Sequence, residues 1–241
     1  GTNIATGSVT SASNSIYLNN IAASGFLQTA NNLSEISSSA NAQIARENLQ
    51  IQGTFQPNDQ GLRVWTFAPE IASNPLNASI VSGATNTGSI ALAKFLPATS
   101  SFTLNNIYIN VATPTTALTS GSNFFGIYVA SAGNFVLTAS TADVSTTIST
   151  AGTKTLPLLS TASIYAGSSY YFGFVLNASA TNPHKLSAGP QAAMMNIGTA
   201  TASASRFLIS TASFSTLSSP IPGANVSTSG GGQYSWWLAA N

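Results

Sequence analysis

The spacing of apolar residues divides the chain into three parts. Residues 1–30 carry isolated apolar residues in a background of Ser, Thr, Ala and Asn. This spacing is too sparse to build a core within one chain, so the segment is either disordered or an extended strand that gains its core from copies of itself. We favour the second interpretation, an extended fibrous stem.

The second part, residues 31–52, contains the one convincing helix, predicted over 32–49. Asn32 and Glu35 have the spacing of a capping box. The apolar residues that follow form a single stripe at helical spacing: Leu33, Ile36, Ala40, Ile44 and Leu49. Because one narrow stripe buries little surface, this short helical collar should pack on a partner helix or on the neighbouring domain.

The third part, residues 53–241, has the pattern of a β domain. Short apolar runs alternate with Gly, Pro, Asn and Ser clusters at intervals of roughly 8–12 residues. The clearest strands are predicted at 88–96, 101–112, 123–130, 134–139, 153–159, 169–177, 205–210 and 233–239. The chain is therefore predicted to be mostly β, with a C-terminal antiparallel β-sandwich of jelly-roll-like type.

Two of these strands permit sharper predictions. In 101–112 the inward-facing positions shift by one residue at Asn105 and Asn106, which predicts a β-bulge there. In 169–177 both faces are largely apolar, which predicts a strand at the centre of its sheet.

Composition adds an uncharged surface to this picture. Only 5% of the 241 residues are charged, 44% are hydrophobic and the formal net charge is +1. Such a chain is too apolar to be disordered, and hydroxyl and amide groups must cover most of its surface. Few Lys side chains are available to protect sheet edges, which favours an oligomer with buried edges.

The same numbers argue against several partners. The six Lys and Arg residues form no cluster, so we expect no nucleic acid partner. No run of 18 apolar residues occurs, so no membrane insertion is expected. With no Cys and one His, no metal site or cofactor is expected either, although an axial ion held once per chain in a trimer stays open.

Few residues could support catalysis. Beyond the predicted helix the carboxylates and imidazole are Asp59, Glu70, Asp143 and His184. Folding could bring two carboxylates together, or join a serine to His184 and Asp143. Each of these residues also has an ordinary loop interpretation, and no Gly-x-Ser-x-Gly motif occurs. We therefore expect no enzymatic activity.

Aromatic residues near the C-terminus are the strongest candidates for receptor contact. Tyr234, Trp236 and Trp237 follow three consecutive glycines, and aromatic faces with a polar group suit sugar or protein contact. Neighbouring residues of a strand point to opposite faces, so only one of the two tryptophans should lie outside the core. Core or subunit-interface positions are the favoured alternative. His184, in a turn expected to be solvated, is the fourth candidate.

Two stretches resemble proteins of bacteriophage fibres. Residues 31–36 (Asn-Asn-Leu-Ser-Glu-Ile) with 45–49 (Ala-Arg-Glu-Asn-Leu) are similar to a short helical motif that recurs in tail fibres, although Gln50 stands where that motif has Gly. Residues 61–180 resemble β-sandwich modules of phage minor tail and tail-fibre proteins, through Trp65-Thr66-Phe67, Asn123-Phe124-Phe125-Gly126-Ile127-Tyr128 and Tyr170-Tyr171.

This resemblance implies a homotrimeric tail fibre of a virion that adheres to a bacterial surface glycan or another envelope receptor. Its other partners would be virion tail proteins. Three alternatives stay open: a purely structural virion fibre in the head or baseplate, a depolymerising tailspike enzyme, and a bacterial trimeric adhesin. The small number of acidic residues and the lack of a β-helix repeat weigh against the tailspike.

Overall fold

The chain divides into two compact units, Gly1–Thr54 and Phe55–Asn241. The computed structural model describes the backbone of 17–18 and 21–22 and residues 57–67, 88–95, 101–115, 117–178, 184–191, 205–227 and 234–241. In the first unit, β1 (Tyr17–Leu18) pairs antiparallel with β2 (Ile21–Ala22). The predicted helix and the rest of the predicted stem lie outside the described residues.

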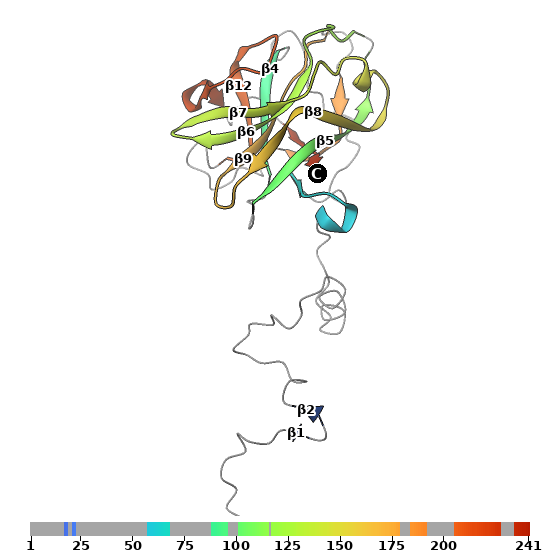
Figure 1. Cartoon of the computed structure of the whole chain (residues 1–241). Helices are drawn as coiled ribbons and strands as arrows, with labels where there is room; N and C mark the ends of the chain where they lie inside the picture. Colours follow the sequence, from blue (N-terminus) through green and yellow to red (C-terminus); the bar gives the residue numbers. More distant parts are fainter. Residues whose placement is uncertain are drawn as a thin grey trace, which may run out of the picture. The chain divides into compact units, whose positions relative to one another are not determined.

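The second unit is built from antiparallel sheets, which confirms the predicted mostly β class (Figure 1). The seven-stranded sheet has the order β13 (Ile221–Pro222), β7 (Asn134–Ser140), β6 (Phe124–Ser131), β9 (Tyr170–Val175), β4 (Ser89–Lys94), β12 (Phe207–Ser213) and β14 (Val226–Ser227). The five-stranded sheet has the order β10 (Lys185–Leu186), β5 (Phe102–Thr113), β16 (Leu238–Ala240) and β3 (Val64–Trp65), with β8 (Gly152–Ile164) paired to β5. A third sheet joins β11 (Ala188–Gln191) to β15 (Tyr234–Trp236).

Both larger sheets contribute alternate residues to one hydrophobic core. The seven-stranded sheet supplies Ala91, Phe125, Ile127, Phe172, Phe174 and Phe207, and the five-stranded sheet supplies Leu104, Ile107, Ile109, Val111 and Leu156. A core shared by two sheets is the arrangement of a sandwich. The sheets are unequal in size, whereas a jelly roll has two sheets of four strands.

Strand β9 is at the centre of the seven-stranded sheet, as predicted. It is the fourth of seven strands, and all six of its residues are buried. Phe172 and Phe174 face the shared core, while Tyr171 and Val175 face a second cluster on the other side of the sheet. The two apolar faces of the sequence therefore correspond to two separate cores.

The predicted bulge in β5 is also confirmed. The N–H groups of Asn105 and Asn106 both donate to the carbonyl of Asn241, at 2.7 and 3.2 Å, so two residues of β5 oppose one residue on that side. On the other side the register also shifts, because residues 158–161 of β8 lie opposite Asn105 alone. Within that stretch, Leu158 forms a bridge to Thr141, at the end of β7.

The seven-stranded sheet is strongly curled. Its outermost strands β13 and β14 are separated along the chain only by the short 3-10 helix η7 (Gly223–Asn225). In a flat sheet the first and seventh strands would lie about 29 Å apart. The chain from Pro222 to Val226 spans at most about 14 Å. The two edges of the sheet must therefore approach each other.

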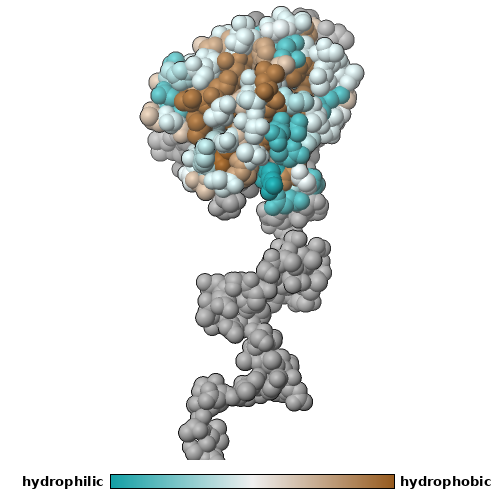
Figure 2. Space-filling model, viewed as in Figure 1, coloured by the Kyte–Doolittle hydropathy of each residue, from teal (hydrophilic) through white to brown (hydrophobic). Residues whose placement is uncertain are grey.

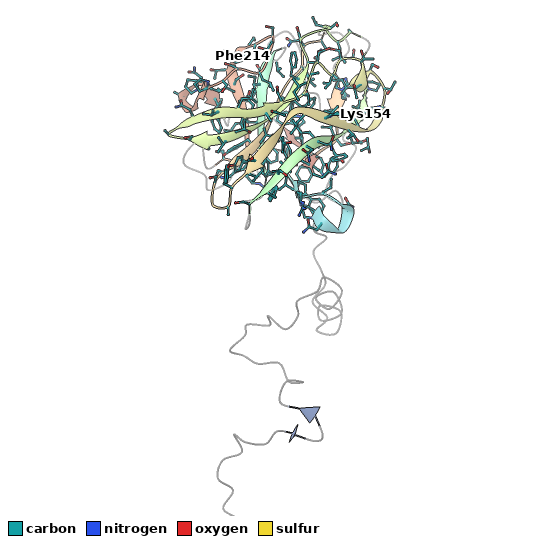
Figure 3. All side chains as sticks on the ribbon, viewed as in Figure 1. Lys154 and Phe214 are labelled. Carbon is teal, nitrogen blue, oxygen red and sulfur yellow. The ribbon has the colours of Figure 1, made fainter. Side chains whose placement is uncertain are left out.

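The concave side of this curl holds the second hydrophobic cluster. Its buried members are Ile90, Leu92, Tyr128, Phe135, Tyr171, Val175, Leu208 and Ile221. Residues 214–227 cover it: Phe214, labelled in Figure 3, together with Leu217 and Val226 packs against the cluster. Tyr128 Oη donates to the carbonyl of Ser218 (2.9 Å), which holds this covering segment to the sheet.

The sheet edges are protected within the described part of the domain. Strands β3, β13 and β14 have two residues each, and the long edge strand β8 carries Lys154, Pro157 and the register shift opposite Asn105. Short edge strands, Lys, Pro and bulges all hinder edge-to-edge pairing. These four edges are therefore protected within one chain, and the oligomer expected from the low charge stays a prediction.

Candidate functional site

The structure buries the two C-terminal tryptophans that were candidates for receptor contact. Trp236 is 3% exposed and Trp237 9% exposed. The Trp236 ring packs edge-on against Phe174, with ring centroids 5.0 Å apart, inside the shared core. Neither indole presents a face to a receptor, so the core alternative applies to both. Tyr234 lies in β15, but its side chain is outside the described part.

The prediction that one of the two tryptophans lies outside the core is wrong because residues 233–239 do not form one strand. The chain leaves β15 after Trp236 and enters β16, in a different sheet, at Leu238. The Thr66 hydroxyl accepts from the Leu238 N–H (3.1 Å) and donates to the Trp236 carbonyl (2.9 Å). The backbone N–H of Trp237 donates to the Ser187 carbonyl (2.9 Å). Alternation stops at this break, and both indoles become buried.

His184 is also buried, which corrects the expectation of a solvated turn residue. Its side chain is fully inaccessible, and its Nδ1 accepts a hydrogen bond from the Thr115 N–H at 3.4 Å. Burial lowers the pKa of His184 to about 4, so the ring is neutral at pH 7. Because Nδ1 is an acceptor, the proton of the neutral ring is on Nε2.

Three of the four residues predicted as candidates for receptor contact are therefore buried and carry buried N–H groups. Within the described residues, His184 Nε2, Trp236 Nε1 and Trp237 Nε1 have no hydrogen-bond partner. Each such donor costs about 1–3 kcal/mol relative to a satisfied one. These residues contribute packing to the domain and are not available for receptor contact.

The candidate catalytic residues do not form a reactive group in the described part. Asp143 Oδ1 accepts from the Asn123 N–H (2.9 Å) and the Ser145 hydroxyl (2.8 Å), whereas His184 bonds to Thr115. Asp143 and His184 are therefore not partnered with each other. Glu70 and the Asp59 side chain lie outside the described part. Among the described residues, no three His, Cys, Asp or Glu side chains gather as a metal site requires.

The surroundings of Asp143 are structural. Asn123 is fully buried and donates from Nδ2 to the Thr119 carbonyl (2.6 Å) and to Ser145 (2.8 Å), and its Oδ1 accepts from the Asn177 N–H (2.7 Å). Burial raises the pKa of Asp143, but hydrogen bonds led by the Asn123 N–H outweigh it and hold that pKa below its usual value. This network joins the loops at one end of the domain.

The exposed apolar residues lie elsewhere, at the end of β8. In the described part, the large hydrophobic side chains that are exposed are Leu159 (72%) and Tyr165 (61%). Between them Thr161 and Ser163 are also exposed, while Ala162 and Ile164 are buried. We call Leu159, Thr161, Ser163 and Tyr165 the β8 row. Leu159 lies in the stretch 158–161 opposite Asn105, and it is exposed, whereas the preceding Leu158 packs on the shared core.

Tyr165 begins a hydrogen-bonded turn between β8 and β9. Its N–H donates to the hydroxyl of Tyr170 (3.1 Å), and its carbonyl accepts from the N–H of Ser168 (3.3 Å). Gly167, with φ of 81°, supplies the left-handed residue that this tight turn needs. The next N–H, that of Ala166, donates to the Ser101 hydroxyl (3.3 Å). The exposed phenol ring therefore projects from a turn whose backbone is hydrogen-bonded on both sides, an arrangement that suits a stacking contact.

The neighbouring positions of β5 extend the row into a polar, uncharged face. Thr103 lies opposite Ser163, and the Thr161 hydroxyl donates to Asn105 Oδ1 at 2.9 Å. All three β5-side positions, Ser101, Thr103 and Asn105, are exposed. Lys154 lies at the other end of β8, where Nζ donates to the Thr150 hydroxyl (Figure 3). Figure 2 shows apolar areas interleaved with pale, weakly polar surface on the visible side of the domain.

Sequence reasoning missed the β8 row because it ended the strand too early. The prediction covered 153–159, whereas β8 continues to Ile164. The alternation of Thr161, Ser163 and Tyr165 with Ala162 and Ile164 was a usable signal for a half-buried strand. It did not show that the outward side would remain uncovered.

Compared with models of protein families, with curated protein sequences and with solved structures, the chain matches none of them. In the described part of the chain, no helix is long and apolar enough to cross a membrane.

Proposed function

We propose that this chain is a receptor-binding protein of a bacteriophage tail fibre, which adheres as a homotrimer to a glycan on the bacterial surface without catalysis. The β8 row provides the main support. An exposed tyrosine on a hydrogen-bonded turn, beside hydroxyl and amide groups, combines an apolar surface with hydrogen-bonding groups. Sugars offer the matching combination of C–H faces and hydroxyls.

Three copies on one fibre would allow weak individual sites to work together. When several sites engage a repetitive surface at once, the overall affinity exceeds that of each site by a factor of about 10² or more. A shallow contact such as the β8 row is therefore sufficient, and no deep pocket is required. The assembled fibre would act outside the cell as part of the virion, attached to other tail proteins.

Among the described side chains, Asp143 and His184 are not joined in the arrangement that a serine-type hydrolase uses. Asp143 is engaged by Asn123 and Ser145, and His184 is inaccessible. Release of oligosaccharides from capsule preparations by the purified chain would contradict the non-catalytic part of the proposal.

The proposal is tested by light scattering and by binding to bacterial envelopes. A homotrimer has a mass of three times 24.5 kDa. We expect that mass, together with adsorption to intact cells or envelope preparations of some strains in a broad bacterial panel. A trimer that adsorbs to no envelope would instead indicate a purely structural virion fibre, and a monomer would contradict the trimeric part.

A further inference from the structure

The β8 row has apolar groups at both ends and polar groups between them. The stretch that contains Leu159 lies opposite Asn105, and Tyr165 lies one residue beyond the pair of Ile164 and Phe102, so the two ends of the row are about four strand positions, or roughly 13 Å, apart. Thr161 and Ser163 lie between them, beside Asn105 and Thr103 of β5. A single sugar ring is too small to reach both ends. A ligand that uses the whole row must be an extended chain.

The chemistry of the row selects against a charged ligand. None of its residues carries a charge, nor do the neighbouring residues Thr103 and Asn105 of β5 and Ser101, which precedes β5. A carboxylate or phosphate would lose water on binding without gaining an ion pair in return. Hydroxyls and amides of a neutral chain can exchange their bonds to water for bonds to Thr161, Ser163 and Asn105 at little cost.

The two ends of the row call for different apolar groups. The flat ring of Tyr165 offers a stacking surface for the C–H face of a sugar ring. Leu159 is aliphatic and 72% exposed, and it suits a small apolar substituent such as the methyl of an acetyl group. An N-acetylated chain supplies both kinds of group without adding charge.

We propose that the ligand of the β8 row is an uncharged, N-acetylated oligosaccharide chain that lies along β8 from Tyr165 to Leu159. This inference rests on the proposed adhesive function and specifies its ligand class. The chain stacks one ring on Tyr165, exchanges hydrogen bonds with the hydroxyls and amide in the middle, and places an acetyl methyl on Leu159.

The probes are chito-oligosaccharides from the disaccharide to the hexasaccharide, with hyaluronan fragments of equal length as acidic N-acetylated controls. Titration calorimetry should give an affinity that rises with chain length until the row is filled. Affinity for the neutral probes should stay constant between about 50 mM and 500 mM salt, because no ion pair contributes. The hyaluronan fragments should bind more weakly at every length.

Three variants separate the two ends of the row. Tyr165→Ala should weaken all probes by roughly 3- to 10-fold, the range expected for loss of one aromatic contact. Leu159→Ala should leave the disaccharide unchanged and remove the gain with chain length. Thr155→Ala, at an exposed position in the other half of β8, is the matched control and should bind like the wild type. All three side chains are exposed, so folding should be preserved.

The possible failures are distinguishable. If the wild type adsorbs to bacterial envelopes and Tyr165→Ala adsorbs equally well, the β8 row is not the binding surface, while the proposed function stands. Tighter binding of hyaluronan than of the neutral probes, or an affinity for the neutral probes that falls steeply with salt, would overturn the inference that the ligand is uncharged. A change of light-scattering mass in Tyr165→Ala or Leu159→Ala would show that a second copy of the chain covers the row. Failure of the wild type to bind any envelope or probe would overturn the proposed function itself.

Discussion

Acid should destabilise the β domain through the protonation of His184. The pKa of His184 is about 4 in the folded state and 6.5 for an ordinary histidine. Between about pH 4 and pH 6.5 the unfolded chain binds more protons than the folded one, so a fall in pH favours unfolding. The stability is fully present above pH 6.5 and is lost progressively as the pH falls to about 4.

The size of this loss of stability follows from the difference between the pKa values of His184 in the folded and unfolded states. Between pH 7 and pH 5 the free energy of unfolding should fall by about 2 kcal/mol, and the full loss near pH 4 is about 3 kcal/mol. Asp143 acts in the same direction, because its pKa is also lowered. Its ordinary pKa is 3.8, so its contribution is lost below about pH 4. The range from pH 7 to pH 5 therefore isolates His184 from Asp143.

The control is His184→Asn, whose Oδ1 can accept from the Thr115 N–H in place of Nδ1 but does not titrate. Urea unfolding followed by tryptophan fluorescence should show a loss of about 2 kcal/mol for the wild type between pH 7 and pH 5. For a domain of this size that loss corresponds to roughly 4–8 °C in Tm. The variant should lose about 2 kcal/mol less than the wild type.

Equal losses in the wild type and His184→Asn would refute this reasoning. So would a nuclear magnetic resonance titration that places the pKa of His184 near 6.5 in the folded protein. Either result would mean that the imidazole reaches solvent or a partner that stabilises its charged form.

Three further changes test the packing and the hydrogen bonds. Gly173→Ala should destabilise the domain by about 1–3 kcal/mol in urea unfolding, because a Cβ there would lie 2.3 Å from the Tyr128 ring, and an unchanged urea midpoint would argue against the clash. Asn123→Ala removes several buried hydrogen bonds and should lower the urea midpoint by the equivalent of about 2–4 kcal/mol, whereas a loss under 1 kcal/mol would show that water replaces the amide. Trp236→Phe removes an unpartnered buried N–H and should cost less than about 2 kcal/mol in thermal unfolding, so a larger loss would indicate that the indole N–H has a partner.

Strand positions in the β domain followed from local patterns. Alternation places β4, β5, β6, β7 and β9 close to their predicted ranges, because the side-chain period of two is a property of each strand by itself. The bulge at Asn105 and Asn106 was visible for the same reason, as a change of phase within one strand. The central place of β9 was visible because both of its faces are apolar.

The sequence did not predict which faces of the strands and which side chains are buried by distant segments. The burial of His184 depends on a bond to Thr115, 69 residues away. The break at Trp237 depends on Thr66, which lies more than 170 residues earlier in the chain. Sequence periodicity describes the faces of one strand, and distant segments decide which of those faces are covered.

The candidate site, too, depends partly on local sequence patterns and partly on contacts between distant segments. The sequence by itself determined a mostly β domain with an uncharged surface rich in hydroxyls and amides, since both properties are set by composition and local alternation. Only the tertiary structure decided that Trp236 and Trp237 are buried while Tyr165 is exposed. An aromatic side chain contributes the same apolar area in a core or on a surface, and the packing of distant strands around it determines which of the two it occupies.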